Sequence, residues 1–117
     1  MPERKRILSV AYIKDLGESR KAILEAAGYE VQVAANVSEA LRHLKESRFH
    51  LVIVGHAVPR REDQLIVKAG RARNTPTLLL YKSDGNFSKE EHFDVENGSA
   101  EFLRIVAQLC LEEQEES

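Results

Sequence analysis

Apolar residues recur along the chain in two periods, and the two kinds of segment follow each other in turn. Some segments alternate or run continuously apolar, as β-strands do, and others repeat their apolar residues at helical spacing. The expected strands are 6–13, 29–35, 50–55, 77–81 and, shorter, 93–97; the expected helices are 16–28, 36–49, 62–73 and one that begins at Ser99. Segment 82–92 is polar and rich in turn residues, so a helix there is expected to be short or missing.

Residues that start and stop helices stand at the edges of these patterns. Asn36 precedes Glu39 by three positions, which resembles a capping box, and Gly28 is a plausible residue just beyond a helix end. Asn74 and Pro76 halt the third helix. Gly17 and Gly70 stand inside helical patterns, where a glycine is either a weak point or a site of close approach.

The apolar stripes predict which side chains face the core. In the first helix the expected stripe consists of Leu16, Ala22, Ile23, Ala26 and Ala27. The corresponding sets are Val31 and Val33 in the second strand, Ala40, Leu41 and Leu44 in the second helix, and Phe102, Leu103, Val106, Leu109 and Cys110 in the last helix.

Strands that alternate with helices predict an α/β fold with a parallel sheet, because each crossover helix must pack back onto the sheet. The third and fourth strands are almost continuously apolar, as buried parallel strands are. We expect a doubly wound, five-stranded parallel sheet in three α/β/α layers, with strand order 2-1-3-4-5. In such a sheet the functional crevice lies at the carboxyl ends of the strands, where the first and third strands diverge.

The composition is that of one ordinary globular domain. The chain has 117 residues, 43% of them hydrophobic and 31% charged, so we expect a single domain over 1–117, with a core at about 6–110 and an acidic tail at 112–117. The formal net charge of −2 argues against nucleic acid or anionic membrane as a partner. The single cysteine and the short apolar runs favour a cytoplasmic protein without a membrane span.

The carboxyl end of the third strand raises a question about chemistry. The stretch 49–59, FHLVIVGHAVP, brings a buried strand to the crevice and places Gly55 there, a residue with no side chain. His56 follows, and Pro59 stands four residues after the glycine.

These segments resemble the receiver domain of two-component response regulators. The resemblance covers about residues 6–110 and rests on EAAGYEVQVAANVSEALRHLKESRFHLVIVGHAVP, on TPTLLLY and on GSAEFLRIVAQL. It implies a flavodoxin-like fold and, in the family, an aspartate at the end of the third strand that accepts a phosphoryl group. The family also uses an acidic pair that holds Mg²⁺, a hydroxyl after the fourth strand and a lysine after the fifth.

The chain departs from the family at every one of these reactive positions. Ala11 and Tyr12 stand where the acidic pair would be, and Gly55 stands in place of the nucleophile. Tyr81 takes the hydroxyl position with a larger phenol, and Glu96 falls near the lysine position. The resemblance therefore implies a pseudo-receiver: a degenerate module of phosphorelay signalling that is not an enzyme, needs no cofactor or metal, and binds a signalling protein or a second copy of itself.

A replacement site is the alternative. The residues expected to gather at this end of the sheet as a ligand or interaction pocket are Tyr12, Gly55, His56, Tyr81 and Lys82. Removal of a side chain at the glycine leaves room for a small uncharged or anionic ligand, which would make the domain a sensor. We favour the simpler interpretation, in which the histidine is an ordinary loop residue and the tyrosines fill the space of the lost metal and phosphoryl group. The four histidines have no metal-ligand spacing.

Overall fold

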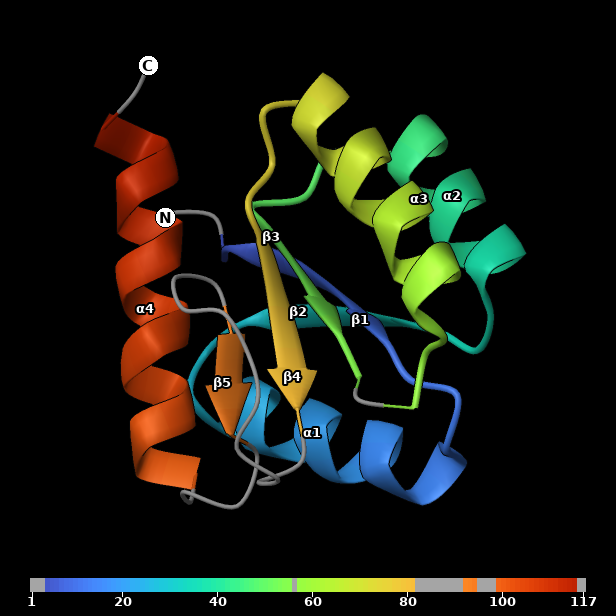
Figure 1. Cartoon of the computed structure of the whole chain (residues 1–117). Helices are drawn as coiled ribbons and strands as arrows, with labels where there is room; N and C mark the ends of the chain where they lie inside the picture. Colours follow the sequence, from blue (N-terminus) through green and yellow to red (C-terminus); the bar gives the residue numbers. More distant parts are fainter. Residues whose placement is uncertain (1–3, 56, 82–91, 95–98, 116–117) are drawn as a thin grey trace.

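The computed structural model describes residues 4–55, 57–81, 92–94 and 99–115, and it alternates strands with helices (Figure 1). The elements in order are β1 (Arg6–Val10), α1 (Lys14–Ala26), β2 (Glu30–Ala34), α2 (Val37–Glu46), β3 (Leu51–Val54), α3 (Arg60–Ala72), β4 (Thr77–Tyr81), β5 (His92–Asp94) and α4 (Ser99–Glu115). The predicted strands and helices are thus present, with ends shifted by a few residues. The prediction for a helix in 82–92 lies largely outside the described residues.

The five strands form one parallel sheet in the order β2-β1-β3-β4-β5, which confirms the predicted fold class. Helices α2 and α3 cover one face of the sheet, and α1 and α4 cover the other (Figure 1). Within the described residues, no helix is both long enough and apolar enough to cross a lipid bilayer.

Each face of the sheet has its own apolar core, because side chains along a strand point alternately to opposite faces. Ile7 of β1 and Ile53 of β3 pack toward α1 and α4, whereas Leu8 and Val52 pack toward α2 and α3. The α4 stripe was predicted correctly: Phe102, Val106 and Cys110 are buried, and Leu103 and Leu109 pack against the same core.

The helix ends follow from the residues that mark them in the sequence. Beyond α1, Gly28 takes a φ of 103°, a left-handed conformation that glycine adopts readily. Its N–H donates to the Glu25 carbonyl at 3.0 Å, and the Tyr29 N–H donates to the Leu24 carbonyl at 3.1 Å. These two bonds form a Schellman motif, which satisfies carbonyl groups at the helix end.

The cap of α2 differs in one detail from the predicted capping box. The Asn36 side chain accepts from the Glu39 N–H at 2.9 Å, as expected. The Glu39 carboxylate accepts from the Ala35 N–H at 2.9 Å, one residue before the cap residue. The turn before the helix is therefore held by the same two side chains through a slightly wider loop.

The predicted buried stripe of α1 was wrong for its three alanines, whereas Ile23 does pack against the core. Ala22, Ala26 and Ala27 are exposed, and Leu16 and Ile23 are only partly buried. The buried residues of this helix are Gly17, Arg20 and Leu24, at spacings of three and four. An arginine thus occupies the middle of the core-facing side of α1, a position that an apolar residue normally takes.

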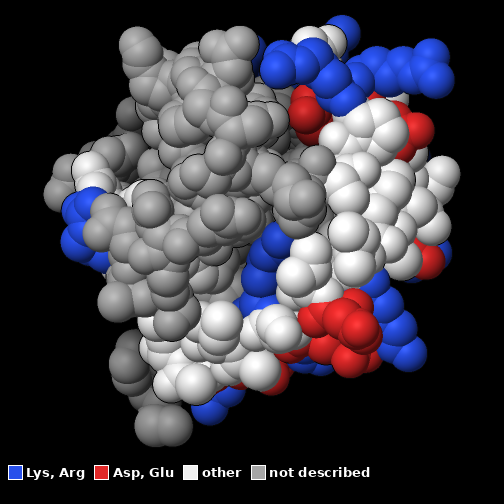
Figure 2. All heavy atoms as spheres, turned by 60° about the horizontal axis from the view of Figure 1, so that its bottom comes forward, with Lys and Arg blue, Asp and Glu red and all other residues white. Residues whose placement is uncertain are grey.

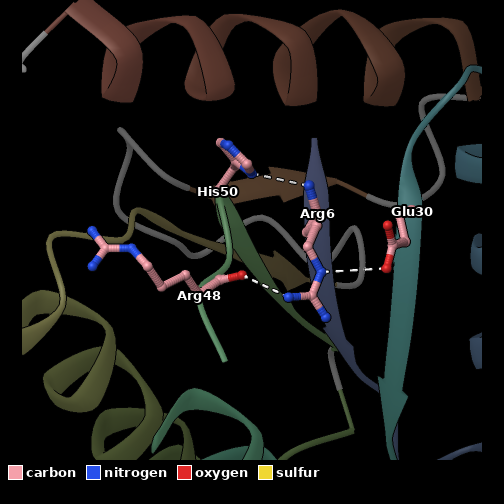
Figure 3. Close-up of polar contacts among 4 residues, drawn as sticks. All are labelled: Arg6, Glu30, Arg48 and His50. Carbon is pink, nitrogen blue, oxygen red and sulfur yellow. Dashed lines mark hydrogen bonds and ion pairs between the residues drawn. The ribbon is translucent and has the colours of Figure 1, made fainter. Parts of the chain in front are cut away.

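A cluster of polar contacts ties the amino-terminal edge of the sheet together (Figure 3). The Arg6 N–H donates to His50 Nδ1 at 3.0 Å, and its guanidinium donates to the Arg48 carbonyl at 3.3 Å. The same guanidinium lies 3.4 Å from the Glu30 carboxylate and 4.9 Å from the centre of the Phe49 ring. Arg6 therefore connects β1 to β2 and to the segment before β3, at the end of the sheet opposite the predicted crevice.

Candidate functional site

The carboxyl ends of β1 and β3 lie side by side, as the strand order requires. Val10 pairs with Val54, and the Gly55 N–H donates to the Val10 carbonyl at 2.8 Å. Gly55 is buried. The third strand therefore delivers Gly55 to the edge where the strand pattern predicted it.

A basic side chain lies next to Gly55. A Cβ atom added to Gly55 would lie 3.0 Å from Nη1 of Arg20, 3.2 Å from the Val10 carbonyl oxygen and 3.8 Å from Cα of Ala11. The nearest side-chain atom is thus a guanidinium nitrogen, and none of these three atoms belongs to Tyr12. Among the described side chains, Arg20 of α1 and not Tyr12 is therefore nearest to this position, whereas a filling role for Tyr81 stays a prediction.

Arg20 is only 8% exposed, and burial lowers the pKa of its guanidinium below the ordinary arginine value. The cause is desolvation, which penalises the charged form. Among the residues that the structure describes, none forms an ion pair or hydrogen bond with the Arg20 side chain. An arginine remains protonated in proteins, so this buried cation has no counter-ion among the described residues.

Close approach of α1 to β1 positions this arginine. A Cβ atom at Gly17 would lie 2.9 Å from Cβ of Ala11, a distance that such atoms do not reach without movement. Gly17 is therefore a site of close approach, which resolves the alternative left open by the sequence. Because Arg20 follows Gly17 by three residues, it lies on the same side of the helix.

Tyr12 makes a separate connection between the loops. Its hydroxyl donates to the Glu62 carboxylate of α3 and accepts from the Val37 N–H at the start of α2 at 3.0 Å. Burial, the hydrogen bond to Glu62 and that carboxylate's charge raise the pKa of the phenol above 10.0, and the bond from Val37 acts in the opposite direction. Tyr12 thus links the end of β1 to two helices on the α2/α3 face.

The remaining predicted site residues are only partly described. Tyr81 ends β4, and its backbone pairs with that of Asp94. His56, Lys82 and Glu96 lie outside the described residues. Within the described ranges, no group of three or more His, Cys, Asp or Glu side chains could hold a metal ion.

The face that carries the carboxyl ends of the strands is shown in Figure 2, where basic atoms lie in a hollow near its centre. Acidic atoms gather elsewhere on the same view. The basic atoms in the hollow do not suit Mg²⁺, since that ion needs carboxylate oxygens.

Our interpretation of the sequence missed Arg20. One signal could have revealed it: Gly17, Arg20 and Leu24 stand three and four residues apart, the spacing of one helix face. Its contact with Gly55 links positions 35 residues apart, and such contacts are set by tertiary packing.

No protein-family model matches the chain, and no curated protein matches it. Solved structures do match. A CheY-like response regulator receiver domain protein from Methanospirillum hungatei has a TM-score of 0.82 at 24% identity, covering 98% of this chain and 100% of that one. The signal receiver domain of an HD domain-containing protein from Pseudomonas fluorescens has a TM-score of 0.83 at 17% identity, covering 99% and 93%.

A third match was solved as a complex. Response regulator TrrA from Thermotoga maritima, solved in complex with Mg²⁺-BeF, has a TM-score of 0.73 at 26% identity and covers 90% of this chain and 98% of that one. The chain therefore has the fold of response regulator receiver domains over nearly its whole length.

Proposed function

We propose that this chain, which has the fold of response regulator receiver domains, is a non-phosphorylatable signalling module that acts by binding another protein. The single observation that carries the proposal is that the guanidinium of Arg20 lies beside Gly55. Where the third strand of a working receiver presents a carboxylate, this chain has no side chain, and a guanidinium nitrogen lies 3.0 Å from the position of the missing Cβ.

Covalent phosphoryl transfer needs a nucleophile, and Gly55 at the end of β3 supplies none. The carboxylate that lies near the end of β1, that of Glu62, accepts from the Tyr12 hydroxyl. A guanidinium is protonated and has no lone pair to attack phosphorus. A glycine in the strand leaves no oxygen to form the acyl phosphate that the family makes.

Metal binding is opposed in the same way. The side chain of Ala11 has no ligand atom, and the Tyr12 hydroxyl is engaged with Glu62 and with the start of α2. The buried positive charge of Arg20 adds repulsion toward a divalent cation. Both requirements of the family's chemistry, the acceptor and the metal, are therefore opposed by residues of this chain.

What such a module retains is its surface. Two large apolar side chains are exposed within the described residues, Ile13 at 43% and Leu65 at 50%. Ile13 follows Tyr12, and Leu65 lies one helical turn beyond Glu62, so both flank the hydrogen bond between Tyr12 and Glu62. We infer that this region contacts a signalling partner or a second copy of the chain in the cytoplasm.

The direct test is exposure to Mg²⁺ and acetyl phosphate, followed by intact-mass measurement. We expect no addition of a phosphoryl group, whereas a receiver domain with its aspartate, treated in parallel, should gain one. A stoichiometric, hydroxylamine-sensitive phosphoprotein would overturn the proposal, because that sensitivity identifies an acyl phosphate.

The contact region is tested by replacing both Ile13 and Leu65 with serine. The variant should lose self-association in sedimentation experiments, or binding to a captured partner, while its thermal midpoint stays close to that of the wild type. Replacement of the exposed Lys14 by serine is the matched control. Equal binding by both variants would show that the contact region lies elsewhere.

One observation favours a second role, the sensing of a small ligand. Arg20 is buried and positively charged, and no residue in the described part of the chain neutralises it. A ligand of opposite charge would do so.

A further inference from the structure

We propose that Arg20 is the receptor for a small oxyanion, a phosphate or a carboxylate, that binds without covalent chemistry at the carboxyl ends of β1 and β3. The proposal rests on the ligand-sensing role and names the chemical class of its ligand. It differs from the family's phosphorylation in two respects: the anion forms no bond to the protein, and an arginine from α1 supplies the positive charge.

An unpaired Arg20 is costly to bury. Arginine is almost never fully buried unless it is paired, since a charge removed from water needs a counter-ion or hydrogen bonds. Arg20 is 8% exposed and lies between Gly17 and Leu24 on the buried side of α1. Within the described ranges neither a carboxylate nor a carbonyl accepts from it.

Access to Arg20 is limited but not closed. In the described part of the chain, the side-chain atoms that are both sealed from solvent and without a partner are Lys5 Nζ and Ser9 Oγ, and no nitrogen of Arg20 is among them. The guanidinium nitrogens therefore keep some contact with solvent, although the side chain as a whole is only 8% exposed. Basic atoms lie in a hollow of the face that carries the carboxyl ends of the strands (Figure 2).

The side chain missing at Gly55 is the one that could neutralise Arg20 from within the chain. The nearest backbone acceptor to the position of a Cβ at Gly55, the Val10 carbonyl, already accepts the Gly55 N–H at 2.8 Å. A Cβ there would already lie 3.0 Å from Arg20 Nη1, so an anion has to approach the guanidinium from its solvent side and not from the glycine. A carboxylate carried by residue 55 would neutralise the guanidinium, and glycine supplies none.

The geometry of the guanidinium indicates the class of ligand. A guanidinium presents its N–H groups as a planar fork that matches two oxygens of a carboxylate or phosphate. Because this fork is already held by α1, little side-chain freedom remains to be lost on binding. Chloride offers no such pair of oxygens, and it provides the control for charge alone.

The experiment measures binding of inorganic phosphate and, separately, acetate to the full chain, with sodium chloride at equal ionic strength as the reference. Amide chemical shifts report the location, and the thermal midpoint reports the stabilisation expected from mass action. Arg20→Met removes the charge and keeps an apolar stem, and it should fold because it removes an uncompensated buried charge. Arg42→Met, at an exposed position of α2, is the matched control.

We expect saturable shifts around Gly55 with phosphate, acetate or both, and the stronger of the two identifies the oxyanion. Affinity should fall about tenfold or more in Arg20→Met, the loss expected for one charge-assisted pair, and stay unchanged in Arg42→Met. Gly55→Asp should abolish binding, because its own carboxylate takes the guanidinium.

The proposal is overturned if neither oxyanion shifts these amides more than chloride does, or if Arg20→Met and Arg42→Met bind equally well. Either result leaves the non-phosphorylatable module intact, since that proposal depends on the separate mass measurement with acetyl phosphate.

Discussion

Placing a carboxylate at Gly55 tests the central geometry of the site through stability. In Gly55→Asp the new Cβ lies 3.0 Å from Nη1 of Arg20, the movable end of a side chain, and 3.2 Å from the Val10 carbonyl oxygen, which is fixed in the sheet. The steric cost of such crowding is about 1–3 kcal/mol. Replacing glycine also restricts the unfolded chain, which stabilises the folded variant by about 0.4–1 kcal/mol.

The ion pair between the introduced carboxylate and Arg20 decides whether Gly55→Asp is less stable than the wild type. A hydrogen bond to a charged group contributes about 1.5–3 kcal/mol, so the aspartate variant should be near the stability of the wild type. Gly55→Asn has the same shape without the charge and should fall about 1.5–3 kcal/mol below the aspartate variant. The difference should disappear in an Arg20→Met background, where the guanidinium is absent.

Urea unfolding at neutral pH, followed by circular dichroism, measures these differences without the added guanidinium ion that would compete for the carboxylate. The pH dependence has a definite sign. Pairing with Arg20 lowers the pKa of the introduced carboxyl below the ordinary aspartate value of about 3.9, so the gain is present above that pH and is lost as the pH falls through the lowered value. Equal stability of the aspartate and asparagine variants in both backgrounds would refute the contact between positions 20 and 55.

Three further outcomes are expected. Gly17→Ala should destabilise the protein by about 1–2 kcal/mol in thermal unfolding, because crowding against Ala11 outweighs the better helix propensity, and Gly17→Ala combined with Ala11→Gly should recover most of the loss. Tyr12→Phe should cost about 1 kcal/mol or more at neutral pH through its lost hydrogen bonds to Glu62 and the backbone. Because the folded-state pKa of Tyr12 is raised above 10.0, that advantage of the wild type is complete below pH 10 and declines as the pH rises through the higher value, which denaturation between pH 8 and 11 would detect. Asn36→Ala should cost about 1 kcal/mol in urea unfolding through loss of the α2 cap, whereas Asn36→Asp should keep it.

The sequence carried the signals for the layers and the strand order because those signals are local. Alternating periods mark the strands and helices, and Gly28 and Asn36 mark two helix ends through backbone geometry that depends on near neighbours. The position of Gly55 at the carboxyl edge followed from the same pattern, since parallel strands deliver their ends to one edge.

The surroundings of Gly55 could not be obtained in this way. The buried side of α1 was misassigned because its alanines look apolar, whereas Gly17 and Arg20 do not. The close approach at Gly17 depends on the distance between α1 and β1, and the enclosure of Arg20 depends on that approach. Both depend on how the elements pack against each other. The spacing of hydrophobic residues along a single element does not determine that packing.

The solitary charge of Arg20 also bears on how fast a ligand would arrive. The chain as a whole carries a formal charge of −2, so its distant field does not draw anions inward. Attraction toward one cation fades over about 8 Å at physiological ionic strength. Anions should therefore associate at an ordinary diffusional rate that added salt changes little. Differences in affinity among anions should appear in their dissociation rates.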